Sequence, residues 1–238
     1  MIIGIGCQND QNVKVPARKV DTSKAEKKSL EKPVAATESS KDLKSFLPEG
    51  YRIFEKIDGD INKDGLADCI LMIKGTDKSK VINDEYRGVL DRNRRGIIAL
   101  LNKGDGYILA FANHDCFSSE NEDGGAYYAP ELSVEIRKGN LYIDYAHGRY
   151  GYWSYTFRFR DNDFELIGYD ESQNSGPVVD SEMSINFLTG RKITKVNTNK
   201  NADGGDEVFT KTVTKIDRGV VNRLSEILDF DDYEFAQK

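Results

Sequence analysis

Short stretches of alternating apolar and polar residues follow one another from Tyr51 almost to the end of the chain, and turn residues separate them. Such alternation indicates a β-strand with one buried face, because successive side chains point to opposite sides of a sheet. Two such stretches joined by Gly, Asn or Asp are typical of a hairpin. A series of hairpins predicts an antiparallel all-β fold, because each strand pairs with its neighbours in sequence.

Three hairpins have the clearest signals. Their turns are predicted at 104–106 in GIIALLNKGDGYILAFANH, at 139–140 in LSVEIRKGNLYIDYA and at 161–163 in YGYWSYTFRFRDNDFELIGYD. One face of the third hairpin carries four aromatic side chains, which are Trp153, Tyr155, Phe157 and Phe159. We expect this face to lie in the core.

The remaining segments complete the predicted fold. Three further strands are expected in SEMSINFLTGRKITKV and EVFTKTVTKID, whereas residues 76–95 are expected to form a long polar connection, part helical at most. Only DRGVVNRLSEILDF has the apolar spacing of a helix, with Val220, Leu224, Ile227 and Leu228 on one stripe and Asp217 as its cap. The predicted fold is an antiparallel meander of hairpins, propeller-like or sandwich, with a short C-terminal helix.

The beginning of the chain differs in composition. Residues 8–46 contain no aromatic side chain before Phe46, and so few apolar groups do not offset the entropy lost on ordering. This part has nine basic and six acidic residues, and the rest has 25 and 34, so the net charges are +3 and −9. We interpret 8–46 as a disordered tether and 47–238 as a single β-rich domain. The acidic surplus argues against a nucleic-acid partner, whose affinity depends largely on neutralised phosphates.

The N-terminal sequence MIIGIGCQNDQN is an apolar stub followed by Cys7 and a polar linker. It resembles the end of a bacterial lipoprotein signal peptide. The resemblance implies that residues 1–7 are the remnant of that peptide and that Cys7 carries the lipid. It also implies a lipid-anchored location in the bacterial cell envelope, either periplasm-facing or surface-exposed. The alternative is an apolar start with an incidental cysteine.

The stretch DGDINKDGLADCILMI places acidic and amide residues directly before an apolar run. Counted from Asp60, oxygen-bearing side chains stand at positions 1, 3, 5 and 9, and Gly65 at position 6 allows a sharp reversal. Ca²⁺ takes about six to eight oxygen ligands, which a tight loop offers from alternate side chains and a carbonyl. Position 12 is Leu71 rather than the glutamate of an EF-hand, so a calcium loop between two strands is favoured.

This nine-residue pattern, DxNxDGxxD, resembles the calcium loops of integrin-type FG-GAP and VCBS-like repeats. The resemblance implies that Ca²⁺ is bound by the carbonyl of Leu66 and by four side chains, those of Asp60, Asn62, Asp64 and Asp68. With its envelope-type tether, the chain resembles bacterial cell-envelope lipoproteins that carry such a loop. The alternative is an ordinary turn held by Asx hydrogen bonds.

The segment NKNADGGDE repeats part of the pattern. Its oxygen-bearing residues define a second candidate metal site, formed by Asn199, Asn201, Asp203 and Glu207. Because Asp-Gly and Gly-Gly are also what any β-turn prefers, an ordinary turn is the alternative here too.

Catalytic motifs of the GxSxG, HExxH and P-loop kinds are absent from the sequence, and the two histidines, His114 and His147, are expected to be structural. A non-catalytic role is therefore favoured. Tyr150 and Tyr152 near Arg149 are candidate ligand-binding residues, because strand-end tyrosines stack on sugar rings or on a partner's surface. This observation leaves a carbohydrate- or protein-binding adhesion module as the first alternative, with a glycan or an envelope protein as ligand, and an envelope hydrolase as the second.

Two cysteines lie in the expected domain, Cys69 and Cys116. In an exported protein they could form a disulfide, which on the chain-entropy model would stabilise by about 4 kcal/mol. Two buried free thiols on neighbouring strands are the equal alternative.

Overall fold

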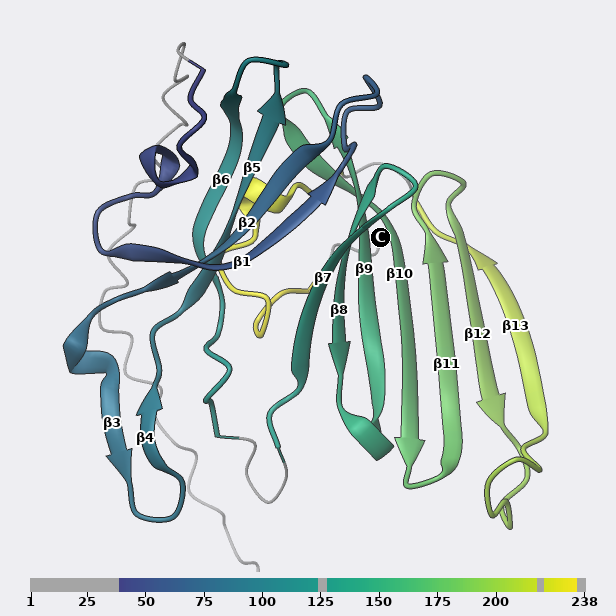
Figure 1. Cartoon of the computed structure of the whole chain (residues 1–238). Coiled ribbons are helices and arrows are strands. Elements are labelled where there is room, and N and C mark those ends of the chain that lie inside the picture. The colour runs from purple at the N-terminus through teal and green to yellow at the C-terminus, as the bar shows by residue number, and fades with distance from the viewer. Residues whose placement is uncertain (1–38, 124–127, 218–220, 235–238) are drawn as a thin grey trace, which may run out of the picture. The chain divides into compact units, whose positions relative to one another are not determined.

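A computed structural model describes residues 39–123, 128–217 and 221–234 (Figure 1). These residues form β-strands in antiparallel sheets, joined by turns and four short 3-10 helices. The all-β fold predicted from the sequence is confirmed. Within the described ranges, no helix has the length and apolar character needed to cross a membrane. Cys7 and residues 8–38 of the expected tether lie outside the described residues.

The smaller sheet has four strands, in the order β1 (Tyr51–Gly59), β2 (Asp68–Gly75), β5 (Arg95–Asn102) and β6 (Tyr107–Phe117). In β2 and β5 every residue except the last is buried. Both faces of these strands are therefore covered, which explains why their sequences are continuous apolar runs rather than alternating ones.

The larger sheet has seven strands, in the order β13 (Phe209–Lys215), β12 (Arg191–Asn197), β11 (Val178–Asn186), β10 (Asp163–Ser175), β9 (Gly151–Arg160), β8 (Asn140–Ala146) and β7 (Glu131–Arg137). Every neighbour in this sheet is also a neighbour in sequence, which is the predicted meander (Figure 1). The three predicted hairpins are those formed by β5 and β6, by β7 and β8, and by β9 and β10.

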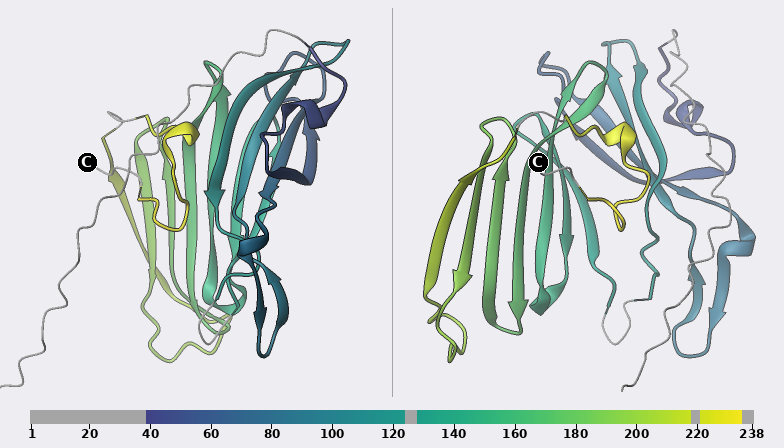
Figure 2. Two further views of the ribbon diagram at one scale, coloured as in Figure 1. Left: turned by 90° about the vertical axis from the view of Figure 1, so that its left-hand side faces the viewer. Right: turned by 180° about the vertical axis from the view of Figure 1, so that it is seen from behind.

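The main hydrophobic core takes its residues from both sheets, which lie as neighbouring layers in Figure 2. Met72 and Ile97 come from the smaller sheet, and Ile143 and Phe157 from the larger. The four aromatic residues of β9 lie as predicted, because Tyr155 and Phe157 are buried while Trp153 and Phe159 pack against the core.

A second, smaller core covers the other face of the four-stranded sheet. Its buried residues are Cys69, Leu71, Ile73, Ile98 and Leu100. The 3-10 helix η1 (Leu43–Phe46) packs Leu43 and Phe46 against them. Just before η1, Ser40 forms a β-bridge with Tyr107, with backbone hydrogen bonds of 2.9 and 2.8 Å. Among the described residues, contact with the sheet thus begins at Ser40, within the segment that the sequence assigned to the tether.

Residues 76–95 contain more structure than a polar connection. A 3-10 helix, η2 (Lys78–Lys80), leads into a hairpin of β3 (Val81–Asp84) and β4 (Gly88–Asp91). Only Leu90 is buried in these two strands, so they lack the alternation of a half-buried strand. The sequence pattern therefore gave no signal for this hairpin.

The expected C-terminal helix is a single 3-10 turn, η4 (Leu224–Glu226). Tertiary hydrogen bonds anchor this segment to the smaller sheet: the side chain of Asn113 donates to the carbonyls of Leu224 and Ile227, both at 2.9 Å, and the N–H of Phe230 donates to the carbonyl of Cys116. Leu228 is 70% exposed, so the predicted apolar stripe does not form. Val220 of that stripe lies outside the described residues.

Candidate functional site

The acidic loop connects β1 to β2, two neighbouring antiparallel strands whose ends pair Gly59 with Asp68. Its backbone turns at two positions of positive φ, Lys63 at 64° and Gly65 at 89°. Glycine adopts this conformation without steric cost, which explains the single glycine within the loop.

Three of the predicted ligand side chains gather on the inside of this turn. The N–H of Asp64 donates to Oδ1 of Asp60 at 3.1 Å and to Oδ1 of Asn62 at 2.9 Å, so two side-chain oxygens lie close to one backbone atom. The amide of Asn62 in turn donates to Oδ2 of Asp64 at 2.9 Å. The other oxygen of Asp60 accepts the N–H of Gly65 at 3.0 Å. The spacing 1, 3, 5 therefore brings these side chains together.

Leu66 follows the turn and is 40% exposed. Its N–H donates to Oδ1 of Asp64 at 2.9 Å, and this hydrogen bond lowers the pKa of the Asp64 carboxyl. The backbone of Leu66, at position 7 of the loop, is thus held directly beside the carboxylate of Asp64, at position 5.

Asp68, the first residue of β2, closes the loop at its C-terminal end. Its side chain is fully buried and accepts three backbone N–H groups, from Ile61 at 3.0 Å, Asn62 at 3.4 Å and Asn102 at 2.9 Å. Burial raises the pKa of this carboxyl, and the three N–H groups oppose the rise. Asp68 therefore joins the loop to the end of β5 as well as to its own first residues.

The loop contacts the larger sheet at the turn between β7 and β8. A Cβ on Gly139 would lie 2.6 Å from Cε of Lys63 and 3.2 Å from the carbonyl oxygen of Asp60. One on Gly59 would lie 2.7 Å from the side chain of Ile136. The loop thus lies where the two sheets meet, and both glycines are needed for the close approach.

The charge of Lys103 acts on this loop, because it contributes to the lowered pKa of Asp64 after the hydrogen bonds from Leu66 and Asn62. Within the described residues, no Lys or Arg forms a salt bridge with Asp60, Asp64 or Asp68. In the same part of the chain, no group of three His, Cys, Asp or Glu side chains is already arranged around a metal position. The backbone N–H groups hold the carboxylates in the conformation described.

The second candidate site, in the loop between β12 and β13, is organised differently. Asn199 donates to the carbonyl oxygen of Asp206 at 3.0 Å and to its carboxylate at 3.2 Å, and that carboxylate also accepts the N–H of Asp203. Glu207 accepts the N–H of Val179, which lowers its pKa. Asn201 donates its N–H to the side chain of Asn199. Asp206, which the spacing rule skips, is central to this loop.

The two candidate ligand-binding tyrosines lie in different pockets. Tyr150 belongs to the 3-10 helix η3 (Gly148–Tyr150) and lines a pocket of about 470 Å³ together with Tyr128, His147 and Arg149. The guanidinium of Arg149 lies 5.3 Å from the Tyr150 ring, and the His147 ring lies 5.2 Å from it. Tyr152 lines a smaller pocket of about 220 Å³ with Asp170, Glu182 and Lys195.

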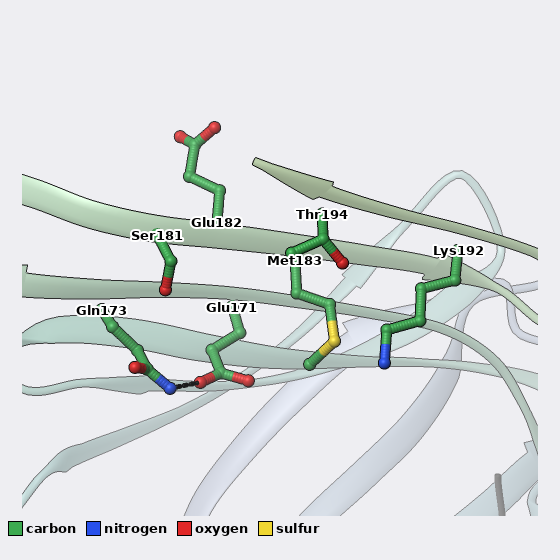
Figure 3. Close-up of a pocket in the computed structure, with 7 residues that line it drawn as sticks. All are labelled: Glu171, Gln173, Ser181, Glu182, Met183, Lys192 and Thr194. Carbon is green, nitrogen blue, oxygen red and sulfur yellow. Dashed lines mark hydrogen bonds between the residues drawn. The ribbon is translucent and has the colours of Figure 1, made fainter. Parts of the chain in front are cut away.

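A third pocket, of about 210 Å³, lies over β10, β11 and β12 (Figure 3). In it Gln173 donates a hydrogen bond to Glu171, and Met183 and Thr194 lie beside them. Glu182 points to the opposite side of β11 from Met183, as alternation along a strand requires. Figure 3 therefore distinguishes the two faces of this part of the sheet.

The two histidines and the two cysteines of the described residues lie in different surroundings. Nε2 of His147 lies 2.9 Å from the carbonyl oxygen of Tyr128, and the His114 ring packs 5.7 Å from that of Tyr51. Cys69 and Cys116 are free, buried thiols, and burial raises the pKa of Cys69 to about 11. They belong to the two different cores, so they are not the pair that a disulfide would need.

The fold and the loop define an antiparallel β-domain with two large sheets, a two-stranded β3–β4 sheet and an acidic β1–β2 connection. Comparisons with protein-family models, curated proteins and solved structures found no match for this chain. Function must therefore be argued from the geometry of the sites.

Proposed function

We propose that the 60–68 loop binds Ca²⁺ and that the chain is a calcium-stabilised, non-catalytic domain anchored to the cell envelope through lipid on Cys7. The observation that carries the calcium site is the approach of the Asp60 and Asn62 side-chain oxygens to one atom, the Asp64 nitrogen. Side chains at three alternate positions share one side of a tight turn, where their oxygens could serve as calcium ligands.

The charge of the loop supports the same proposal. Three carboxylates lie within nine residues, and one of them, Asp68, is fully buried. Carboxylates so close together repel, and a buried charge without a counterion destabilises the fold. A divalent cation would offset both effects. The residues that would hold it are Asp60, Asn62, Asp64 and Asp68 with the carbonyl of Leu66.

Bound calcium would stiffen the contact between the sheets, because the loop touches the β7–β8 turn at Gly139. Sites in extracellular modules bind Ca²⁺ with Kd values of about 10⁻⁴–10⁻³ M. At about 1 mM Ca²⁺ and a Kd near 0.1 mM, binding would add roughly 1.4 kcal/mol to the free energy of unfolding. The expected role of the ion is thus structural.

Chelation should lower the melting temperature of the full chain by about 3–6 °C relative to 1 mM Ca²⁺, measured by circular dichroism. Asp64→Ala should remove most of this calcium-dependent difference, because it removes the carboxylate at the centre of the turn. Asp203→Ala is the matched control in the second loop and should leave most of the difference in place. A wild-type melting temperature that is the same with calcium and with chelator would refute the proposal.

The 199–207 loop is proposed as a second, weaker calcium site. Here Asp206 joins the predicted residues, since Asn199 and Asp203 both hydrogen-bond to its carboxylate. The number of ions bound in a calorimetric titration, compared between wild type and Asp203→Ala, separates one site from two.

The pocket at η3 favours one alternative, a carbohydrate- or protein-binding module. It combines an aromatic ring, Tyr150, with the cationic Arg149, and this pairing suits a sugar or a partner side chain. Tyr150→Ala should therefore abolish any glycan-array or pull-down signal, whereas Tyr152→Ala, in a separate pocket, should retain it. Equal loss in both variants would contradict a site at η3.

A further inference from the structure

The strands β12 and β13 extend beyond the part of the larger sheet that the core covers. None of their residues is buried, and all seven residues of β13 are exposed. In Figure 1 they lie at the end of the sheet away from β1 and β2. Among the described residues, no strand pairs with β13 on its outer side. This arrangement leaves an accessible sheet edge.

The register identifies which backbone groups point out from this edge. The N–H of Ile216 donates to the carbonyl of Gly190, and the N–H of Thr198 donates to the carbonyl of Val208. In an antiparallel pair every second residue bonds to the same neighbour, so the even-numbered residues of β13 bond to β12. The N–H and C=O groups of the odd-numbered residues therefore point the other way. These residues are Phe209, Lys211, Val213 and Lys215.

The side chains near this edge are strongly cationic. Together β12 and β13 carry five basic residues and no acidic one, in a chain whose net charge is −6. Arg191 lies directly opposite Lys215, and Lys195 opposite Lys211, on the face that also carries Glu182. Like charges directly opposite each other destabilise a sheet.

Glu182 offsets only part of this charge. It lies 2.6 Å from Nζ of Lys195, whereas no salt bridge joins Lys211 or Lys215 to any acidic residue of the described ranges. Negative charge added beside the two edge lysines, Lys211 and Lys215, would therefore reduce the repulsion most.

We propose that an extended acidic peptide segment adds to this sheet as an antiparallel strand beside β13. The four outward-pointing residues would supply the backbone hydrogen bonds. Acidic side chains opposite Lys211 and Lys215 would form cross-strand ion pairs, and an apolar side chain would lie opposite Val213, which is 50% exposed. The partner strand thus has the alternating pattern acidic–x–apolar–x–acidic.

Charge argues against a second copy of this chain as the occupant. Antiparallel pairing of two β13 strands would place Lys211 and Lys215 of both copies on one face, next to Arg191 and Lys195 of both. Lysines on an edge strand also block pairing with apolar or basic strands. The same lysines attract an acidic strand, so they select the partner.

The test uses a fluorescein-labelled peptide, Glu-Thr-Val-Thr-Glu-Thr-Val, added to the full chain at low ionic strength, with fluorescence anisotropy as the readout. The double variant Lys211→Glu/Lys215→Glu should weaken binding at least about tenfold, since two attractive pairs become repulsive. It should instead bind the peptide that has lysines in place of the glutamates. Both changed side chains are exposed, so the fold should be retained.

Two further variants separate strand addition from simple charge attraction. Val213→Pro removes one outward N–H and no bond to β12, so it should weaken binding although the charge is unchanged. Lys192→Glu reverses a single lysine charge, on β12 and on the other face of the sheet, and should bind as wild type does. The proposal is overturned if wild type does not bind the peptide, if Val213→Pro binds equally well, or if Lys192→Glu loses as much as the double variant.

Discussion

Phe230→Ala should lower the free energy of unfolding by about 3–5 kcal/mol. Phe230 is only 4% exposed, although it follows η4 near the end of the described residues. Its ring stacks on Phe117 with centroids 4.9 Å apart and meets Tyr155 edge-on at 5.2 Å. Truncation would leave a cavity among aromatic rings from both sheets, and urea denaturation followed by tryptophan fluorescence measures the loss.

Leu228→Ala is the matched control for this prediction. Leu228 lies two residues earlier in the same segment but is 70% exposed, so its truncation should change the free energy of unfolding by less than about 0.5 kcal/mol. Comparable losses in the two variants would mean that the segment does not occupy the core as described.

Gly96→Ala should destabilise the fold by more than about 3 kcal/mol and reduce the soluble yield. A Cβ at this position would lie 2.0 Å from the carbonyl oxygen of His114 and 2.5 Å from that of Asn113. Both are backbone atoms of the paired strand β6, so no side-chain rotation relieves the overlap. The register between β5 and β6 shifts here, between Arg95 and Ile97, which brings the two backbones together.

Gly168→Ala provides the comparison, because Gly168 also lies at a register shift, between β9 and β10. The nearest atom to a Cβ there is Cβ of Thr156, at an ordinary 3.4 Å. This substitution should cost less than about 1 kcal/mol, measured by the same denaturation experiment. If the two alanine variants are equally stable, the close approach at Gly96 is not present in solution.

The order of strands could be predicted because it depends on local signals. Alternation in β7 to β10 and turn residues such as Gly139 and Asn162 identified the hairpins and the buried face of β9. The C-terminal segment could not be predicted in this way. Its helical spacing is overridden by hydrogen bonds from Asn113, a residue far away in the sequence.

The candidate site was likewise predictable only where its contacts are local in the sequence. The grouping of Asp60, Asn62 and Asp64 follows from their spacing around Gly65, so the sequence alone indicated it. The contact of Asp68 with the N–H of Asn102 depends on the pairing of β2 with β5 and has no local signal.

The separation of Tyr150 and Tyr152 into two pockets also could not be predicted from the sequence. Strand alternation would place these two side chains on one face. However, Tyr150 lies in a 3-10 helix, and Gly151 between them has a φ of 112°. The helix and this conformation interrupt the strand geometry, so the shared site expected from the sequence becomes two.

The placement of the cysteines has a practical consequence. Cys69 lies in the small core beneath η1, whereas Cys116 lies in the main core between the sheets, and both are fully shielded from solvent. A thiol reagent reaches each sulfur only when the hydrophobic core around that sulfur opens. The described part of the chain therefore contains two buried natural reporters. Their modification rates would tell whether η1 detaches from the four-stranded sheet before the two large sheets separate.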